Sequence, residues 1–159
     1  MLIETPEEAS KFVKKWMDDR KVFRNDASDK SKNDVHFSYD GTSDIGVNFS
    51  IQQPKNMVRV VGVTTKLLFD EQQLRKLKSL TSKKRERFLK NLGEKLLFVS
   101  PASAPGPDME TPEWILFIKE ISYDELTEGR LIDAVDQLGR AIIFVSTLIT
   151  DEFGEPKKE

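Results

Sequence analysis

The first clear pattern along the chain is an amphipathic helix that begins near residue 6. Thr5-Pro6-Glu7-Glu8 supplies a capping hydroxyl, a proline at the first helical position and a glutamate three residues after the cap. Apolar side chains then recur at helical spacing, at Ala9, Phe12, Val13, Trp16 and Met17. This stripe predicts a helix that covers the core. The next segment, 25–34, is polar and rich in turn formers, so we expect a mobile loop there.

Alternation with a period of two then predicts three strands. Val35, Phe37 and Tyr39 share one face, and after Asp40-Gly41 the alternation resumes from Ile45 to Ile51. Two such runs joined by a short glycine-containing turn are typical of an antiparallel hairpin. The valine-rich stretch 57–65 is apolar on both faces and predicts a more enclosed third strand. The expected unit is a three-stranded antiparallel meander.

Helical spacing returns after residue 69. Asp70 and Gln73 resemble a capping box, and Leu74 and Leu77 follow it. Thr81-Ser82 begins a second apolar stripe with these members: Phe88, Leu89, Leu92, Leu96 and Leu97. The pattern allows either one kinked helix or two over 69–99. Segment 100–112 holds four of the seven prolines, so a second mobile loop is expected there.

A buried strand and a long helix complete the predicted order. Trp114 to Ile118 is apolar at five consecutive positions, as in strands that are covered on both faces. The final helix has an apolar seam at Leu131, Val135, Leu138, Ile142, Val145 and Ile149. The tail, 154–159, is charged and is expected to fray. The fold class is therefore α+β, with one domain over residues 1–159 and helices packed on the sheet.

Two apolar residues lie on the polar side of that last helix. Asp133, Asp136 and Arg140 occupy this side in its first half, but Ile143 and Phe144 occupy it further along. Exposed apolar patches commonly mark contacts with partners, so Ile143 and Phe144 are a candidate partner or dimer surface. The alternative is that other parts of the chain bury both side chains.

Composition narrows the function classes. The chain has 159 residues, of which 38% are hydrophobic, enough for one sizeable core. It has no cysteine, which excludes disulfides, a thiolate nucleophile and sulfur-ligated zinc. The formal charge of −2 gives no general attraction to nucleic acid. The acidic start and the shortness of the apolar runs, none longer than Ala141 to Val145, predict a cytoplasmic protein without a membrane segment.

The candidates for chemistry are few. His36 is the only histidine and the natural general base, but no serine elbow or phosphate-binding glycine loop accompanies it. A solvated or locally hydrogen-bonded histidine is therefore the preferred interpretation, with no catalytic residue, metal or cofactor expected. A small enzyme or ligand-binding domain that uses His36 and nearby carboxylates is the alternative. A weaker alternative is nucleic-acid binding through the basic run Lys83, Lys84, Arg85 and Arg87, whose ordinary interpretation is a solvated helix face.

Two resemblances add to this reading. The element order resembles the secretion-chaperone-like fold of type III secretion chaperones and their non-secretory relatives. Segments 69–74, 77–80, 85–89 and 121–127 are similar to an uncharacterised archaeal family of domains of unknown function. These motifs are caps, leucines and a strand-to-helix junction, so no catalytic residue comes with them.

The fold resemblance implies a small acidic dimer that holds an extended segment of another protein against its sheet and helices. This chain departs from that pattern in being nearly neutral. The leading hypothesis is a non-enzymatic chaperone- or adaptor-like protein-binding module that forms a homodimer.

Overall fold

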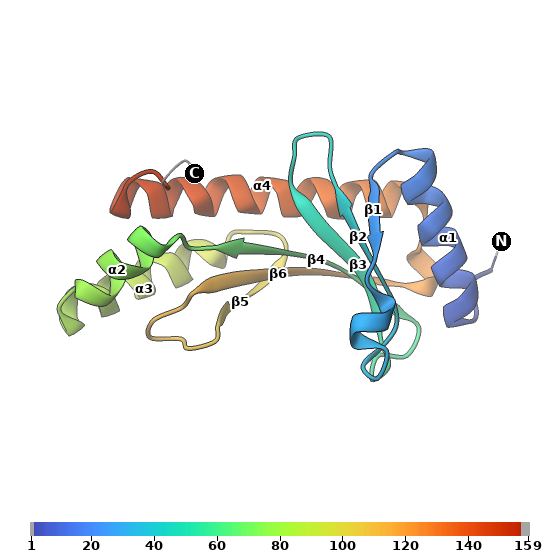
Figure 1. Ribbon diagram of the computed structural model, residues 1–159, viewed down its shortest axis with the longest axis horizontal. Coiled ribbons are helices and arrows are strands. Elements are labelled where there is room, and N and C mark those ends of the chain that lie inside the picture. Colours follow the sequence, from blue (N-terminus) through green and yellow to red (C-terminus); the bar gives the residue numbers. More distant parts are fainter. Residues whose placement is uncertain (1, 157–159) are drawn as a thin grey trace. The chain divides into compact units, whose positions relative to one another are not determined.

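A computed structural model describes residues 2–156 of the chain (Figure 1). Its elements, in order, are α1 (Pro6–Asp19), β1 (Phe23–Asp26), the 3-10 helix η1 (Ser28–Ser31), β2 (Val35–Thr42), β3 (Asn48–Pro54), β4 (Val60–Leu68), α2 (Glu71–Ser79), α3 (Ser82–Leu96), β5 (Ala102–Gly106), β6 (Trp114–Ser122), the 3-10 helix η2 (Tyr123–Glu125) and α4 (Glu128–Phe153). The six strands are ordered β1-β2-β3-β4-β6-β5. The predicted α+β class and long C-terminal helix are confirmed.

The residues form two compact units, and β4, β6 and α4 contribute to both. Unit 1 comprises residues 1–65 and 118–139, and unit 2 comprises 66–117 and 140–159. The boundaries fall after Thr65 in β4, after Phe117 in β6 and after Gly139 in α4. The single domain expected from the sequence stays a prediction beside this division, and each unit is described by itself below.

In unit 1, α1 begins where its cap predicts. The Glu8 backbone N–H donates to Thr5 Oγ1 at 3.2 Å, and the Thr5 N–H donates to Glu8 Oε2 at 3.1 Å. This reciprocal pair satisfies two backbone donors that the first turn leaves free. Four members of the predicted stripe are buried, namely Ala9, Val13, Trp16 and Met17, whereas Phe12 is half-buried. The stripe therefore packs against the meander as expected.

The hairpin turn lies three residues later than predicted. β2 runs through Asp40-Gly41 to Thr42, which pairs with Asn48, and the turn occupies 43–47 with Gly46 at a φ of +80°. Gly41 stays within the strand because its Cα is closely surrounded: a Cβ there would lie 2.7 Å from the Phe49 ring and 2.8 Å from Met17 Cε. The glycine is required for close packing rather than for a turn.

Both segments expected as loops contain an edge strand. Segment 25–34 includes the end of β1 and all of η1, and segment 100–112 includes β5. β1 pairs with β2, with Phe23 opposite Gly41 and Asp26 opposite Tyr39. The polar and proline-rich sequences gave no strand signal, because backbone pairing with a neighbour holds these edge strands in place. Their mobility stays a prediction.

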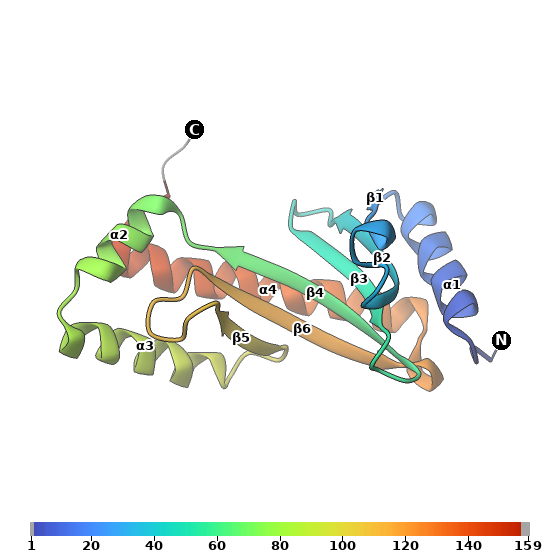
Figure 2. The same cartoon turned by 60° about the horizontal axis from the view of Figure 1, so that its bottom comes forward.

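In unit 2, the stretch 69–99 forms two helices rather than one kinked helix. Asp70 and Gln73 make the predicted capping box of α2, and Thr81 caps α3. Phe88 of α3 packs edge-to-face on Phe153 of α4, with ring centroids 4.8 Å apart. Figure 2 shows α3 running beside β5. An aromatic contact therefore packs α3 against the end of α4 in this unit.

The end of α4 is held more firmly than the predicted frayed tail. Lys76 Nζ donates to the Phe153 carbonyl at 2.6 Å, and Gln73 Nε2 donates to the Gly154 carbonyl at 3.2 Å. Gly154 has a φ of +89°, the left-handed geometry common after a helix end. Residue 154 is therefore fixed, and residues 157–159 lie outside the described part of the chain.

The buried face of α4 differs slightly from the predicted seam. Ala134 and Ala141 are buried, whereas Val135 and Ile142 are half-buried. The other buried members of the seam are Leu131, Leu138, Val145 and Ile149.

Candidate functional site

The candidate site is an apolar groove in unit 2, between the C-terminal half of α3 and β5. Its volume is about 600 Å³, which lies within the usual range of ligand pockets. The lining comes from α3, from the turn after it, from β5 and from the turn before β6; its members include Leu89, Leu92, Leu96, Leu97, Val99, Ser103, Pro105, Met109 and Pro112. The groove is therefore built mainly from aliphatic side chains and prolines.

Several of the large apolar side chains here meet solvent. Leu97 is 83% exposed, Phe98 directly after it is 90% exposed, and Met109 is 73% exposed. The sequence pattern placed Leu97 in the core stripe of α3, which is wrong, because α3 ends at Leu96 and Leu97 is its C-cap. Exposed apolar side chains clustered around a hollow are typical of a surface that another molecule covers.

β5 supplies the backbone side of this site. It is the last strand in the sheet order, so its outer edge has no strand neighbour in the described residues. The Glu113 N–H donates to the Gly106 carbonyl at 2.8 Å, so Gly106 directs its backbone groups toward β6. Backbone direction alternates along a strand, so Ser103 and Pro105 direct theirs to the outer edge. Both residues also line the groove.

The basic run lies on the same helix, one to two turns before the groove. Lys83, Lys84 and Arg87 are exposed and Arg85 is half-buried. Arg85 borders a smaller hollow with Glu110 and Leu89, and Leu89 also lines the groove. Among the residues that the structure describes, none of the four basic side chains has an ion-pair partner. Their charge is therefore available to an acidic ligand.

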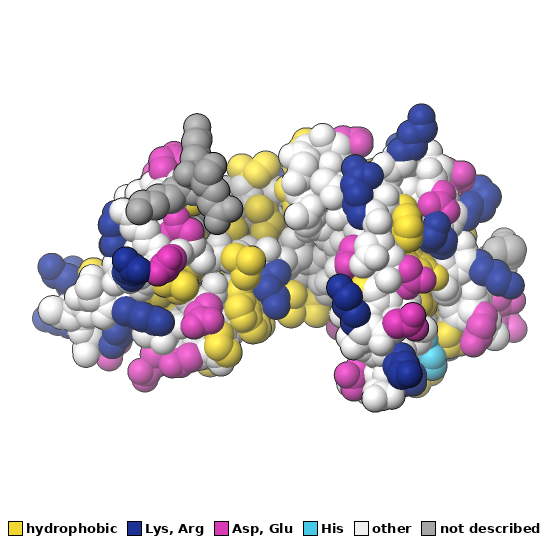
Figure 3. Space-filling model, viewed as in Figure 1, with side chains coloured by type: hydrophobic (Ala, Val, Ile, Leu, Met, Phe, Trp, Pro, Cys, Tyr) yellow, Lys and Arg dark blue, Asp and Glu magenta, His cyan; other side chains and the backbone are white. Residues whose placement is uncertain are grey.

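Ile143 and Phe144 are exposed, as their position on α4 suggested. Ile143 is 55% exposed and Phe144 is 43% exposed. Figure 3 shows hydrophobic side chains, in yellow, over the middle of α4. Within residues 2–156 neither side chain is buried. Whether a partner or a second copy covers them stays a prediction.

His36 is an exposed residue of β2 and lines neither the groove nor the smaller hollow beside Arg85. In the part of the chain described here its imidazole has no hydrogen bond or ion pair. A general base works within hydrogen-bond reach of its substrate and is oriented by a neighbouring group. The structure gives His36 no such neighbour.

The described residues meet the requirements of neither a metal site nor a membrane-spanning helix. Across residues 2–156, no three His, Asp or Glu side chains come close enough to form a metal site. Within the same range no helix has the length and apolar character required to span a bilayer.

Sequence reasoning missed the groove, although a signal was present. The run Leu96-Leu97-Phe98-Val99 is apolar at four successive positions immediately after a predicted amphipathic helix. A helix can bury only some members of such a run on one side, so the others must meet solvent or a partner. The sequence gave no signal for β5, because two of its five residues are Pro105 and Gly106, which are rare in strands.

Comparisons with known proteins give a family and a fold. A family model described as "Uncharacterized conserved protein (DUF2299)" matches residues 9–149. A crystal structure of an uncharacterized protein from Methanothermobacter thermautotrophicus has a similar fold, with a TM-score of 0.81 and 20% sequence identity. The match covers 92% of this chain and 99% of that chain. No curated protein matches the sequence.

These findings confirm the resemblance to an uncharacterised family, and the similar solved structure is archaeal. At 20% identity that structure supports the fold alone. Neither finding concerns a secretion chaperone, so the chaperone-like part of the resemblance stays a prediction.

Proposed function

The chain belongs to this family of uncharacterized conserved proteins, and on that premise we propose that it is a non-catalytic, cytoplasmic, adaptor- or chaperone-like module that binds an extended segment of another protein in the groove between α3 and β5. One observation carries the proposal: a largely aliphatic groove runs along a sheet edge that has no strand neighbour in the described residues. This combination is what an added strand requires, with pockets for its side chains and a backbone edge for its amides.

The apolar lining supplies the affinity in this proposal. Leu97 and Met109 are covered when a segment occupies the groove, and each loses most of a large exposed surface. Burying a side chain of this size stabilises a complex by about 1.5–3 kcal/mol. Leu92 forms the floor and is already buried in the free protein, so it contributes shape rather than new buried area.

The backbone of β5 sets the conformation of the bound segment. Ser103 offers an N–H and a carbonyl at the outer edge, and Pro105 offers a carbonyl only. The missing N–H at Pro105 also discourages indiscriminate pairing with other strands, as prolines on edge strands commonly do. An extended segment pairs with Ser103 and places alternate side chains in the groove.

The positive charge of α3 favours a partner segment that has acidic residues beside its apolar ones. The helix carries six basic side chains, Lys83, Lys84, Arg85, Arg87, Lys90 and Lys95, against two acidic ones, Glu86 and Glu94. A segment with acidic residues beside its apolar ones complements this surface and approaches it faster at low salt. The basic run therefore serves protein recognition here rather than nucleic-acid binding.

A homodimer through the second half of α4 completes the proposal. Ile143 and Phe144 are adjacent on α4, and both are exposed. In a two-fold dimer, the commonest oligomer symmetry, Ile143 and Phe144 of one chain face the same two residues of the other chain.

The test uses a labelled peptide that alternates leucine with glutamate, measured by fluorescence anisotropy. Leu97→Asp is the test variant, and Val58→Asp is the matched control because Val58 is similarly exposed, at 81%, but belongs to unit 1. Binding by the wild type and by Val58→Asp, with loss in Leu97→Asp, supports the proposal. A leucine–lysine peptide and a single-stranded oligonucleotide are expected not to bind.

Two results contradict the proposal. Equal binding of the peptide by Leu97→Asp and the wild type removes the groove as the docking site. Binding of the oligonucleotide in preference to the acidic peptide assigns the basic face to nucleic acid instead.

A further inference from the structure

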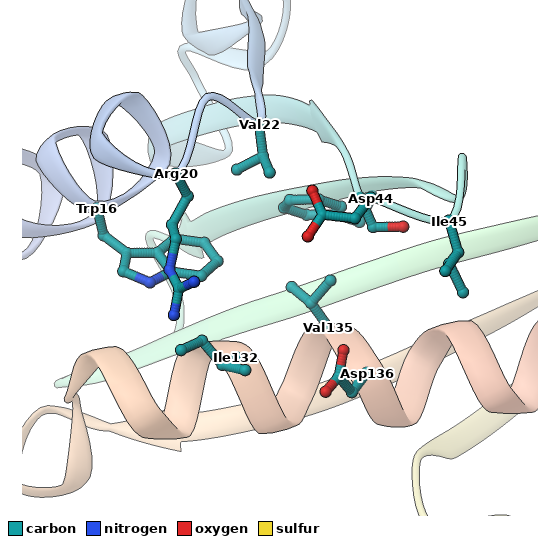
Figure 4. A pocket seen from close by; sticks show the side chains of 10 residues that line it. Trp16, Arg20, Val22, Asp44, Ile45, Ile132, Val135 and Asp136 are labelled. Atoms are coloured by element: carbon teal, nitrogen blue, oxygen red, sulfur yellow. The ribbon is translucent and has the colours of Figure 1, made fainter.

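Another hollow lies entirely within unit 1, and it differs in character from the apolar groove. Its volume is about 140 Å³, and its walls come from α1, from the β2–β3 hairpin and from the first half of α4 (Figure 4). The apolar part includes Phe49, Ile132 and Val135. The polar part includes Trp16 of α1 and its C-cap residue Arg20, together with Asp44 and Asp136. The space suits a small molecule that has both apolar and charged parts.

Trp16 supplies a buried donor without an acceptor. Its side chain is only 5% exposed, and in residues 2–156 its Nε1 is the one buried side-chain nitrogen or oxygen that lacks a hydrogen-bond partner. Buried polar groups are nearly always hydrogen-bonded, so an orphan of this kind needs an explanation. The indole N–H can only donate, so the group that it lacks is an acceptor.

Arg20 places further donors beside the indole. It follows Trp16 by four residues, so both side chains lie on one face of α1. In Figure 4 the guanidinium and the indole nitrogen lie together on the side that faces Ile132 of α4. Within the described residues the Arg20 side chain makes no hydrogen bond or ion pair, although Asp18 and Asp19 of the same turn are both paired with lysines.

An unpaired guanidinium beside an unpaired indole N–H is a receptor for a carboxylate. The planar guanidinium matches both carboxylate oxygens, and a third donor from the indole adds to this pair. Asp44 and Asp136 come from the other walls, and in the described part of the chain neither carboxylate has an ion-pair partner. They provide acceptors for a positive group at the opposite end of the hollow, as Figure 4 shows.

We propose that this hollow, the Trp16–Arg20 pocket, binds a small aliphatic amino acid. The ligand carboxylate accepts from Arg20 and from Trp16 Nε1, its ammonium faces Asp44 and Asp136, and its apolar side chain packs on Phe49 and Val135. This site is independent of the peptide groove, since it shares no lining residue with it. The protein thereby gains a small-molecule ligand in addition to its protein partner.

The test follows the indole N–H signal of Trp16 by two-dimensional ¹H–¹⁵N NMR during titration with L-leucine. Trp114, the second tryptophan, is not part of the pocket and serves as an internal control. 4-Methylpentanoate and isoamylamine are titrated in parallel, because the first is leucine without its ammonium and the second is leucine without its carboxylate. We expect saturable movement of the Trp16 signal with leucine, weaker binding of 4-methylpentanoate and no binding of isoamylamine.

Two arginine variants complete the design. Arg20→Gln weakens leucine binding by roughly tenfold or more, because it removes a charge-assisted pair, whereas Arg24→Gln leaves it unchanged. Both arginines are exposed, so neither change threatens the fold. An unmoved Trp16 signal up to the solubility limit of leucine overturns the proposal, as does equal binding by Arg20→Gln or binding of the amine alone.

Discussion

Truncation of Leu92 and Leu97 to alanine, one at a time, separates the structural and the binding roles of α3. Both side chains line the groove, and they lie five residues apart on or at the end of the same helix. Leu92 is 4% exposed and Leu97 is 83% exposed. The same chemical change therefore removes packed atoms at one position and solvated atoms at the other.

The magnitudes follow from this difference in burial. Leucine-to-alanine changes at buried positions cost about 2–5 kcal/mol of unfolding free energy, and Leu92→Ala belongs to that class. For Leu97 only about a fifth of the side chain is covered, and full burial of a leucine is worth about 1.5–3 kcal/mol, so Leu97→Ala costs about 0.5 kcal/mol or less. In the complex the order changes, because Leu97 becomes buried and its truncation then loses about 1–2 kcal/mol, or roughly 5–30-fold in affinity.

Urea unfolding, followed by tryptophan fluorescence, measures the stability part, and anisotropy with the leucine–glutamate peptide measures the binding part. We expect a lower midpoint without a change in slope for Leu92→Ala, and a wild-type curve for Leu97→Ala. A destabilisation above about 2 kcal/mol in Leu97→Ala refutes the reasoning, since the side chain would then be packed within the folded chain. Unchanged affinity in a stable Leu97→Ala variant refutes the groove.

Three further predictions concern other parts of the chain. A Cβ at Gly106 would lie 2.3 Å from the Trp114 ring, so Gly106→Ala is expected to cost on the order of 1–3 kcal/mol in urea unfolding; a wild-type midpoint would show that the ring can move aside. Burial raises the pKa of the Tyr123 hydroxyl, which donates to Gln53, so its contribution to stability is full below pH about 10 and is lost as pH rises through the folded pKa. Tyr123→Phe, which leaves Gln53 unpaired at a cost of about 1–3 kcal/mol, should remove this alkaline loss when midpoints are compared between pH 8 and 11; an unchanged slope with pH would assign the loss to other groups. Phe144→Glu is expected to halve the mass of a homodimer in sedimentation equilibrium, and a dimer of unchanged mass would place its interface elsewhere.

The sequence was sufficient for elements whose signals are local. The start of α1 depends on a capping box, and that of α2 depends on another, so both boundaries could be read within two residues. The long α4 and the apolar β6 follow from periodicity and from composition. Such elements carry their own information in consecutive residues.

Elements that depend on distant partners could not be read in this way. β1 and β5 are strands because β2 and β6 lie beside them, not because their own residues alternate. The hairpin turn was misplaced for a related reason, since Gly41 resembles a turn residue and is in fact required by the close approach of Phe49 and Met17. Tertiary packing determined the structure at each of these positions.

The functional surfaces show the same division. Helical spacing alone places Ile143 and Phe144 on the polar side of α4, but it left open whether other parts of the chain bury them; in the structure both are exposed. The groove lies within residues 89–112, and only its α3 side had a sequence signal, since β5 gave none. The Trp16–Arg20 pocket was not predictable, because it combines residues from segments far apart in the chain. His36 drew attention through its chemistry, but the fold leaves it exposed and without a partner in the described residues.

Hydrogen exchange at the Ser103 amide tests the proposed strand addition most directly. This amide points to the outer edge of β5, where the bound segment is expected to pair with it. Saturation with the leucine–glutamate peptide should slow its exchange while leaving the amides of β1, the opposite edge strand, unchanged. Peptide binding without any added protection at Ser103 would contradict pairing at β5, and the bound segment would then lie elsewhere on the molecule.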